Sequence, residues 1–112
     1  MSTHMQITVT VTSYYQEDFE KTFPKLARHL GHLDAALVRS NPSLYFLASR
    51  LDKLLYTFDG TEVREVLLRH REELQSLYKE SEANIADWHL AQADKLLYKI
   101  EDVFAEIEAE LS

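Results

Sequence analysis

Four stretches of the chain carry apolar residues alternately three and four positions apart, so that these residues share one face of a helix. The stretches are 19–37, 44–58, 63–77 and 86–111. A mean spacing of 3.5 residues is the pattern with which helices pack against one another through interlocking side chains. Short connections force successive helices to run antiparallel. The chain is therefore predicted to be all-α, an antiparallel up-down-up-down four-helix bundle.

Turn-forming residues separate the four stretches. Asn41 and Pro42 predict a helix start, with the asparagine as N-cap and the proline at the first helical position. The Asp-Gly-Thr sequence at 59–61 supplies a glycine that ends one helix and a threonine that caps the next. Pro24 is predicted to kink the first helix or to mark its start after a short first turn. The boundary at 81–84 is weaker, so the last two stretches are either two helices or one bent helix.

The composition points to one soluble domain. The chain has 112 residues, of which 46% are apolar, and no cysteine, so disulfides and thiolate metal sites are excluded. No apolar run reaches the length of a membrane helix, and no secretory signal is apparent. We expect a cytoplasmic protein with an N-terminal arm at 1–15 and a helical bundle domain at 16–112. Residues 1–4 resemble a cloning remnant ahead of Met5.

Residues 6–12 alternate between apolar and polar side chains, with Ile7, Val9 and Val11 on one face. This period of two, with β-branched residues, predicts a short N-terminal β-strand. No second strand is predicted, and a strand needs a partner for its backbone groups. Three outcomes stay open: pairing with the same strand of a second copy, pairing with another protein, or no strand. The first outcome, a homodimer, is our expectation.

The pentapeptide DKLLY occurs twice, at 52–56 and at 94–98. We call the apolar face of each stretch its seam. In both copies of the pentapeptide the helical period places the leucines in the seam and leaves the aspartate and the tyrosine on its border. A shift of the first seam by 42 positions leaves it two residues out of register with the third. The repeat is therefore predicted to be one structural pattern used twice, with duplication of a functional unit as the alternative.

The net charge of −7 lies entirely in residues 61–112, because residues 1–60 carry six acidic and six basic side chains. Such an acidic half repels nucleic acid and attracts a basic protein. Carboxylates at the end of a helix oppose its macrodipole, so local helix stability does not explain the acidic C-terminal turns. The residues predicted to steer a partner are Glu101, Asp102, Glu106, Glu108 and Glu110.

Two large aromatic residues are predicted to point away from the core. Phe46 and Trp88 lie on the helix faces opposite to their apolar seams, and Tyr45 adjoins Phe46. Exposed aromatic side chains are typical anchors of protein interfaces, and we therefore predict that these three residues bind a partner. A second apolar stripe on the last helix serves either intramolecular packing or a partner surface. It consists of Ile85, Leu96 and Val103.

Histidines support two alternative functions. His29 and His32 lie one helical turn apart, a spacing with which two histidines can bind zinc. Arg64 and His70 form an Arg-x5-His pattern that resembles the motif of the HEPN ribonucleases, which are also small helical domains. That resemblance rests on these two residues and implies RNA cleavage. Glu65 stands beside Arg64, and the arginine and histidine do not share a helix face.

The pattern as a whole favours a small acidic, non-enzymatic interaction module, such as an adaptor, an inhibitor or an antitoxin-like regulator. Its expected partner is a basic protein, with no cofactor, no direct contact with nucleic acid and no membrane. The alternative is a HEPN-like ribonuclease or a metal-binding helical bundle that uses His70 with Arg64, or His29 with His32.

Overall fold

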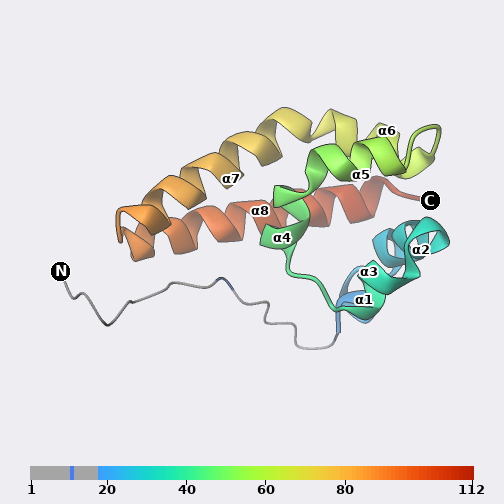
Figure 1. Cartoon of the computed structure of the whole chain (residues 1–112), viewed down its shortest axis with the longest axis horizontal. Helices are drawn as coiled ribbons and strands as arrows, with labels where there is room; N and C mark the ends of the chain where they lie inside the picture. The colour runs from blue at the N-terminus through green and yellow to red at the C-terminus, as the bar shows by residue number, and fades with distance from the viewer. Residues whose placement is uncertain (1–10, 12–17) are drawn as a thin grey trace, which may run out of the picture.

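The structure, a computed structural model, describes residue 11 and residues 18–112, and this part of the chain contains helices but no strand (Figure 1). None of the helices described is long and apolar enough to cross a membrane. The helices are α1 (Phe19–Thr22), α2 (Pro24–Leu33), α3 (Ala35–Arg39), α4 (Leu44–Ser49), α5 (Leu51–Thr57), α6 (Glu62–Arg69), α7 (Arg71–Ala86) and α8 (Leu90–Glu110).

The predicted N-terminal strand falls almost wholly outside the described residues. Ile7 and Val9 are not described, and Val11 is partly exposed and in no regular secondary structure. Strand pairing and the homodimer that depends on it therefore stay predictions.

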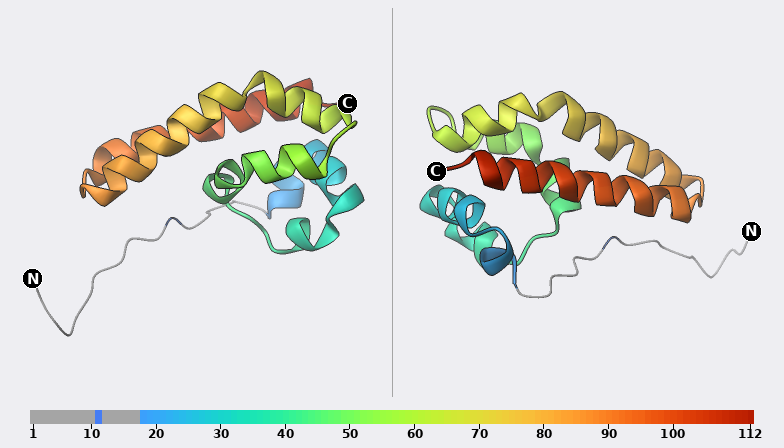
Figure 2. Two further views of the ribbon diagram at one scale, coloured as in Figure 1. Left: turned by 45° about the horizontal axis from the view of Figure 1, so that its top comes forward. Right: turned by 180° about the vertical axis from the view of Figure 1, so that it is seen from behind.

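The all-α class is confirmed, but the up-down-up-down four-helix bundle is not. Three of the four predicted stretches are broken, so that this part of the chain forms eight helices. Helices α7 and α8 lie side by side, whereas α1, α2 and α3 gather at the end of the molecule near the C-terminus (Figures 1 and 2). The short first helices thus cover one end of the long pair and do not run along its length.

The first stretch breaks twice. Helix α2 begins at Pro24, which confirms the predicted helix start after a short first turn. A second break follows at Asp34, whose Oδ1 accepts a hydrogen bond from the backbone N–H of Leu37 at 3.1 Å and so caps α3. Leu33, predicted to lie in the seam, is 53% exposed just before this break.

The predicted cap at Asn41 is wrong. Helix α4 begins at Leu44, and the hydroxyl of Ser43 accepts a hydrogen bond from the N–H of Phe46 at 3.0 Å. Asn41 has a φ of +53°, a conformation that asparagine tolerates better than most residues. Its side-chain oxygen accepts a hydrogen bond from the N–H of Phe19 at 2.7 Å. Asn41 thus ties the chain before α4 to the start of α1.

Of the other two predicted turns, the one at 59–61 is confirmed, whereas the one at 81–84 is wrong. Gly60 has a φ of +80° between α5 and α6, and the hydroxyl of Thr61 accepts a hydrogen bond from the N–H of Arg64 at 3.4 Å. The weak boundary at 81–84 lies inside α7, which continues to Ala86 before the chain turns into α8. The last two stretches are therefore separate helices, with the turn a few residues later than predicted.

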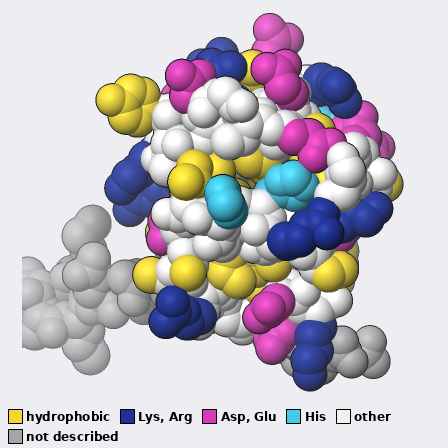
Figure 3. Space-filling view, turned by 90° about the vertical axis from the view of Figure 1, so that its right-hand side faces the viewer, with side chains coloured by type: hydrophobic (Ala, Val, Ile, Leu, Met, Phe, Trp, Pro, Cys, Tyr) yellow, Lys and Arg dark blue, Asp and Glu magenta, His cyan; other side chains and the backbone are white. Residues whose placement is uncertain are grey.

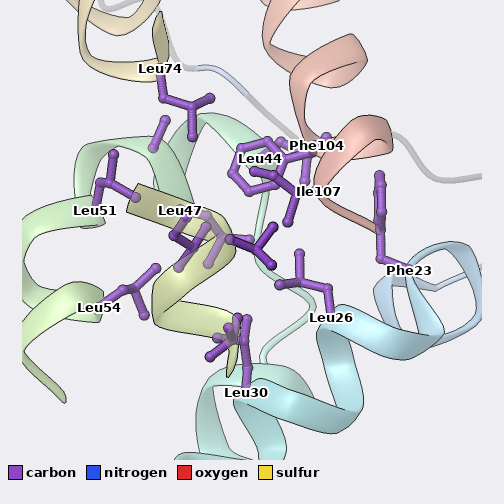
Figure 4. Packing of buried hydrophobic residues seen from close by; sticks show 14 of the residues in the cluster. Phe23, Leu26, Leu30, Leu44, Leu47, Leu51, Leu54, Leu74, Phe104 and Ile107 are labelled. Atoms are coloured by element: carbon purple, nitrogen blue, oxygen red, sulfur yellow. The ribbon is translucent and has the colours of Figure 1, made fainter. Parts of the chain in front are cut away.

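The core forms where α2, α4, α5 and α6 pack against the paired helices α7 and α8. Leucines from several of these helices converge with Phe23, Phe104 and Ile107 (Figure 4). Leu96 and Val103 are 2% and 3% exposed, so this part of the second stripe on α8 packs within the chain. Full burial of such a side chain stabilises the fold by about 1.5–3 kcal/mol.

The repeated pentapeptide occupies equivalent positions in α5 and α8. Both leucines of the first copy are buried; in the second copy Leu96 is buried and Leu97 is partly buried. The aspartates and lysines are exposed, and Tyr56 and Tyr98 are 86% and 60% exposed. The inward leucines confirm the predicted structural pattern, because the same half-buried helix face occurs twice.

Candidate functional site

The turn between α7 and α8 is the one end of the apolar seam that stays uncovered by the described chain. The two helices extend beyond α4 to this turn (Figures 1 and 2). Ala86 and Leu90 belong to the predicted seam, yet both are exposed, Leu90 by 42%. At the other end of α8, Leu111 is 2% exposed, so the seam is covered there. The overhang therefore lies at the N-terminal end of α8.

Trp88 occupies the position of this turn where glycine is usual. Its N–H donates to the carbonyl of Ile85 at 3.1 Å, and the N–H of His89 donates to the carbonyl of Asn84 at 2.8 Å. These two bonds form a Schellman motif, in which the residue after the helix cap is left-handed. Trp88 has a φ of +61° and is 53% exposed. A bulky aromatic residue in this conformation is uncommon.

The turn is poorly optimised for stability. The left-handed conformation costs a residue with a Cβ atom about 1–2 kcal/mol. His89, which precedes α8, makes no side-chain capping bond, so a further stabilisation of about 1 kcal/mol is absent. More than half of the Trp88 surface stays in water, which limits the compensation from packing within the chain. We call Trp88 and Leu90, with the partly buried Ile85, the tip.

The other predicted anchors lie on α4. The rings of Tyr45 and Tyr78 pack with their centroids 4.9 Å apart. Burial, and then a hydrogen bond from its hydroxyl to Glu82 at 3.0 Å, raises the pKa of Tyr78 to about 12. Phe46 is 41% exposed, with the guanidinium carbon of Arg50 5.3 Å from its ring centroid. Tyr45 is thus packed within the chain, whereas Phe46 remains partly exposed beside Arg50.

The structure does not bring the predicted aromatic anchors into one cluster. Tyr45 packs on Tyr78, which precedes Trp88 by ten residues of the chain, or about 15 Å of helix. Among the described residues no ring contact joins Phe46 to Trp88. The tip and the exposed ring of α4 are therefore separate surfaces.

Glu108, predicted to face a partner, instead caps another helix. Its Oε1 accepts a hydrogen bond from the N–H of Lys25, and its Oε2 from the N–H of Leu26, both at 2.8 Å. These N–H groups belong to the first turn of α2, which has no side-chain cap of its own. The positive end of a helix dipole favours a carboxylate. Glu108 thus opposes the dipole of α8 but complements that of α2.

Two further acidic residues of α8 bind His70, which lies at the break between α6 and α7. His70 Nε2 is 2.6 Å from Glu110 Oε2, and Nδ1 is 3.8 Å from Glu106 Oε2. The histidine side chain is only 12% exposed. Glu106, Glu108 and Glu110 therefore fasten the end of α8 to α2 and to the α6–α7 junction. We call these three carboxylates the clamp.

Glu101 and Asp102 are the predicted steering residues that take no part in the clamp. Both are exposed, and neither forms an ion pair within residues 18–112. Partial burial, followed by the neighbouring carboxylates of Asp102 and Asp94, raises the pKa of Glu101. These side chains form the acidic surface of α8 that is available to a partner.

Sequence reasoning missed the clamp because its contacts join residues far apart in the chain. Glu108 is 83 positions from Lys25, and Glu110 is 40 positions from His70. The one signal was the unfavourable placement of carboxylates at the C-terminal end of α8. That signal has two explanations, an external partner or an internal one, and three of the five carboxylates have internal partners.

The residues of the alternative functions have separate surroundings. His29 and His32 line one pocket, but no group of three or more potential metal ligands occurs among the described residues. Arg64 Nε donates to a backbone carbonyl of α5 at 3.0 Å and lies 3.6 Å from Asp59 Oδ1. His70 is held by the clamp. Arg64 and His70 thus each have their own contacts within the chain.

No protein-family model, curated protein or solved structure matches this chain. The geometry described above is therefore the basis for assigning a function.

Proposed function

We propose that this protein is a non-enzymatic protein–protein interaction module whose contact surface is centred on the tip. The observation that carries the proposal is Trp88, a half-exposed tryptophan in the glycine position of the α7–α8 turn. Strained residues concentrate at functional sites. Tryptophan is also among the residue types most enriched at the energetic centres of interfaces.

Binding would remove the exposed part of the indole and of Leu90 from water. Each square ångström of apolar surface buried contributes about 25 cal/mol, so a partner supplies the stabilisation that the free chain lacks at this turn. Phe46 is a second, separate anchor for a partner large enough to reach α4.

A basic protein fits the charge around the tip. Asp87 precedes Trp88, and Asp94 follows Leu90 by about one helical turn; both carboxylates are exposed. Glu101 and Asp102 extend this acidic surface along α8. The proposal depends on these residues and not on the clamp, whose carboxylates have partners within the chain. An acidic module of this kind acts as an adaptor, an inhibitor or an antitoxin-like regulator.

The test compares tip variants in a binding assay. Wild type, Trp88→Gly, Trp88→Ala and Tyr56→Ala are immobilised, and proteins retained from the native lysate are identified at low and at high salt. We expect a basic protein that is retained by wild type at low salt, released by high salt and lost from both Trp88 variants. Tyr56→Ala, which removes an exposed aromatic residue elsewhere, is the control and should retain the partner.

The single tryptophan of the chain provides a direct readout. Adding the purified partner should shift the fluorescence of Trp88 to shorter wavelength and protect it from acrylamide. Equal retention of the same proteins by wild type and Trp88→Gly would refute the tip as the contact surface.

We also propose that the protein is a homodimer through its N-terminal strand. Deleting residues 1–12 should halve the mass measured by light scattering while the helical circular-dichroism signal is retained. An unchanged mass would exclude pairing through this strand.

A further inference from the structure

A small pocket lies at the end of the molecule opposite the tip. It has a volume of about 280 Å³ and is lined by Arg28, His29 and His32 of α2 and by Phe58 and Thr61 around the α5–α6 turn. Figure 3 shows this end, with two histidines in the middle of the face and basic side chains on both sides. Although the protein is acidic as a whole, no carboxylate of the described residues lines this pocket, whose remaining lining residues, Leu33 and Val63, are apolar.

Two of these donors already converge on one oxygen atom. Arg28 Nη2 donates to the carbonyl oxygen of Ser112, and His29 Nε2 lies 3.1 Å from the same oxygen. The other neighbour of His29 Nε2 is Glu62 Oε2, at 3.3 Å. Because both neighbours are acceptors, Nε2 carries the proton. The Ser112 oxygen thus shows where an oxygen of a bound anion would sit.

The charges around the pocket select the type of anion. A hydrogen bond from the hydroxyl of Ser112 lowers the pKa of Glu62, and the nearby His29 and Arg28 lower it to a smaller extent. This carboxylate therefore stays ionised beside the donors. A dianion such as phosphate would be repelled by Glu62 more strongly than a monoanion would. His32 is exposed and makes no hydrogen bond to another described residue, so its ring is available at the rim.

We propose that this pocket binds a small monocarboxylate with a short apolar body. One carboxylate oxygen takes the place of the Ser112 carbonyl between Arg28 and His29, and the apolar body lies against Leu33, which is 53% exposed, and the other apolar residues that line the pocket. The volume is below the usual range for drug-sized ligands, which suits a molecule of the size of benzoate. This site is independent of the tip and of the proposed function.

The experiment is a titration of the full chain followed by amide NMR shifts, with benzoate as the probe and benzamide as its neutral counterpart. Benzoate should shift the amides of Arg28, His29, Thr61 and Ser112 in a saturable manner, whereas benzamide should not. Arg28→Gln should weaken benzoate binding about tenfold, because it removes a charge-assisted hydrogen bond. Lys25→Ala, which removes one positive charge elsewhere on α2, is the matched control and should bind like wild type.

Three results would overturn the proposal. They are equal shifts with benzoate and benzamide, unchanged binding by Arg28→Gln, and an equal loss with Lys25→Ala, which would show a response to net charge alone. A blocked glutamate dipeptide tests the other source of a carboxylate, an acidic side chain of a polypeptide. Tighter binding of this peptide than of benzoate would refute the assignment to a small free acid.

Discussion

The two ends of helix α8 differ in whether their locally unfavourable residues find partners within the chain. At the C-terminal end, three carboxylates that the helix dipole disfavours bind the N-terminus of α2 and His70. At the N-terminal end, Trp88 and Leu90 have no such compensation from the described chain and stay exposed. Both ends conflict with local helix preferences, but only the first conflict is resolved by the tertiary structure.

The difference separates the residues with a structural role from those for which we propose a functional one. A locally unfavourable group that finds a partner inside the fold, as Glu108 does, needs no external explanation. One that finds none, as Trp88 does, is where a partner is best sought. Sequence reasoning treated the two ends alike and assigned both to a binding partner. The variants below test whether the ends behave differently.

The largest effect on stability should come from Glu108→Ala. Loss of the carboxylate leaves two N–H groups of α2 without an acceptor in the protein and removes a charge from the positive end of that helix. We expect unfolding free energy to fall by about 2 kcal/mol, measured by urea denaturation. Glu101→Ala, which removes an exposed carboxylate of the same helix, is the control and should change it little. Equal urea midpoints for the two variants would contradict the capping role.

At the tip, relief of backbone strain should stabilise the protein, whereas Glu108→Ala should destabilise it. Trp88→Gly and Trp88→Ala both remove the indole, but only glycine adopts a φ of +61° without strain. The glycine variant should therefore be more stable than the alanine variant by about 1 kcal/mol, while both lose partner binding. If the alanine variant were the more stable, the left-handed turn would not persist in solution.

The pair formed by His70 and Glu110 should contribute less than the cap. We expect a coupling free energy of about 0.5–1 kcal/mol in a double-mutant cycle of His70→Gln and Glu110→Gln. The value is modest because Glu106 remains near the histidine when Glu110 is neutralised. Strictly additive effects of the two substitutions on the urea midpoint would remove this pair from the clamp.

The smallest effect concerns the exposed carboxylates between the two ends. The pKa of Glu101 is raised in the folded protein, so its ionisation opposes folding. This cost is absent below the unfolded-state pKa of about 4.3 and appears as the pH rises through the higher folded-state value. Glu101→Gln should thus stabilise the protein at pH 7 by a few tenths of a kcal/mol, given its exposure, and not near pH 4. Destabilisation by this substitution at pH 7 would show that the charge has a favourable partner.

Local sequence signals were reliable where the physics is local. Pro24 and Gly60 mark a helix start and a turn through their own backbone preferences. The breaks at Arg50 and His70 were missed because the apolar spacing continues through them, as it does when two short helices bury the same face. The candidate anchors were identified by their helix faces, but the structure shows that only Trp88 combines exposure with backbone strain.

The sequence by itself determined that the described chain is helical and identified most of the apolar residues that are buried, because both follow from spacing and turn chemistry within a few residues. Only the tertiary structure decided which end of the apolar seam is covered and which carboxylates are bonded. Those outcomes depend on contacts such as that between Glu108 and Lys25, 83 positions apart. No local pattern encodes such a contact, because it exists only when separate helices are brought together by the packing of the core.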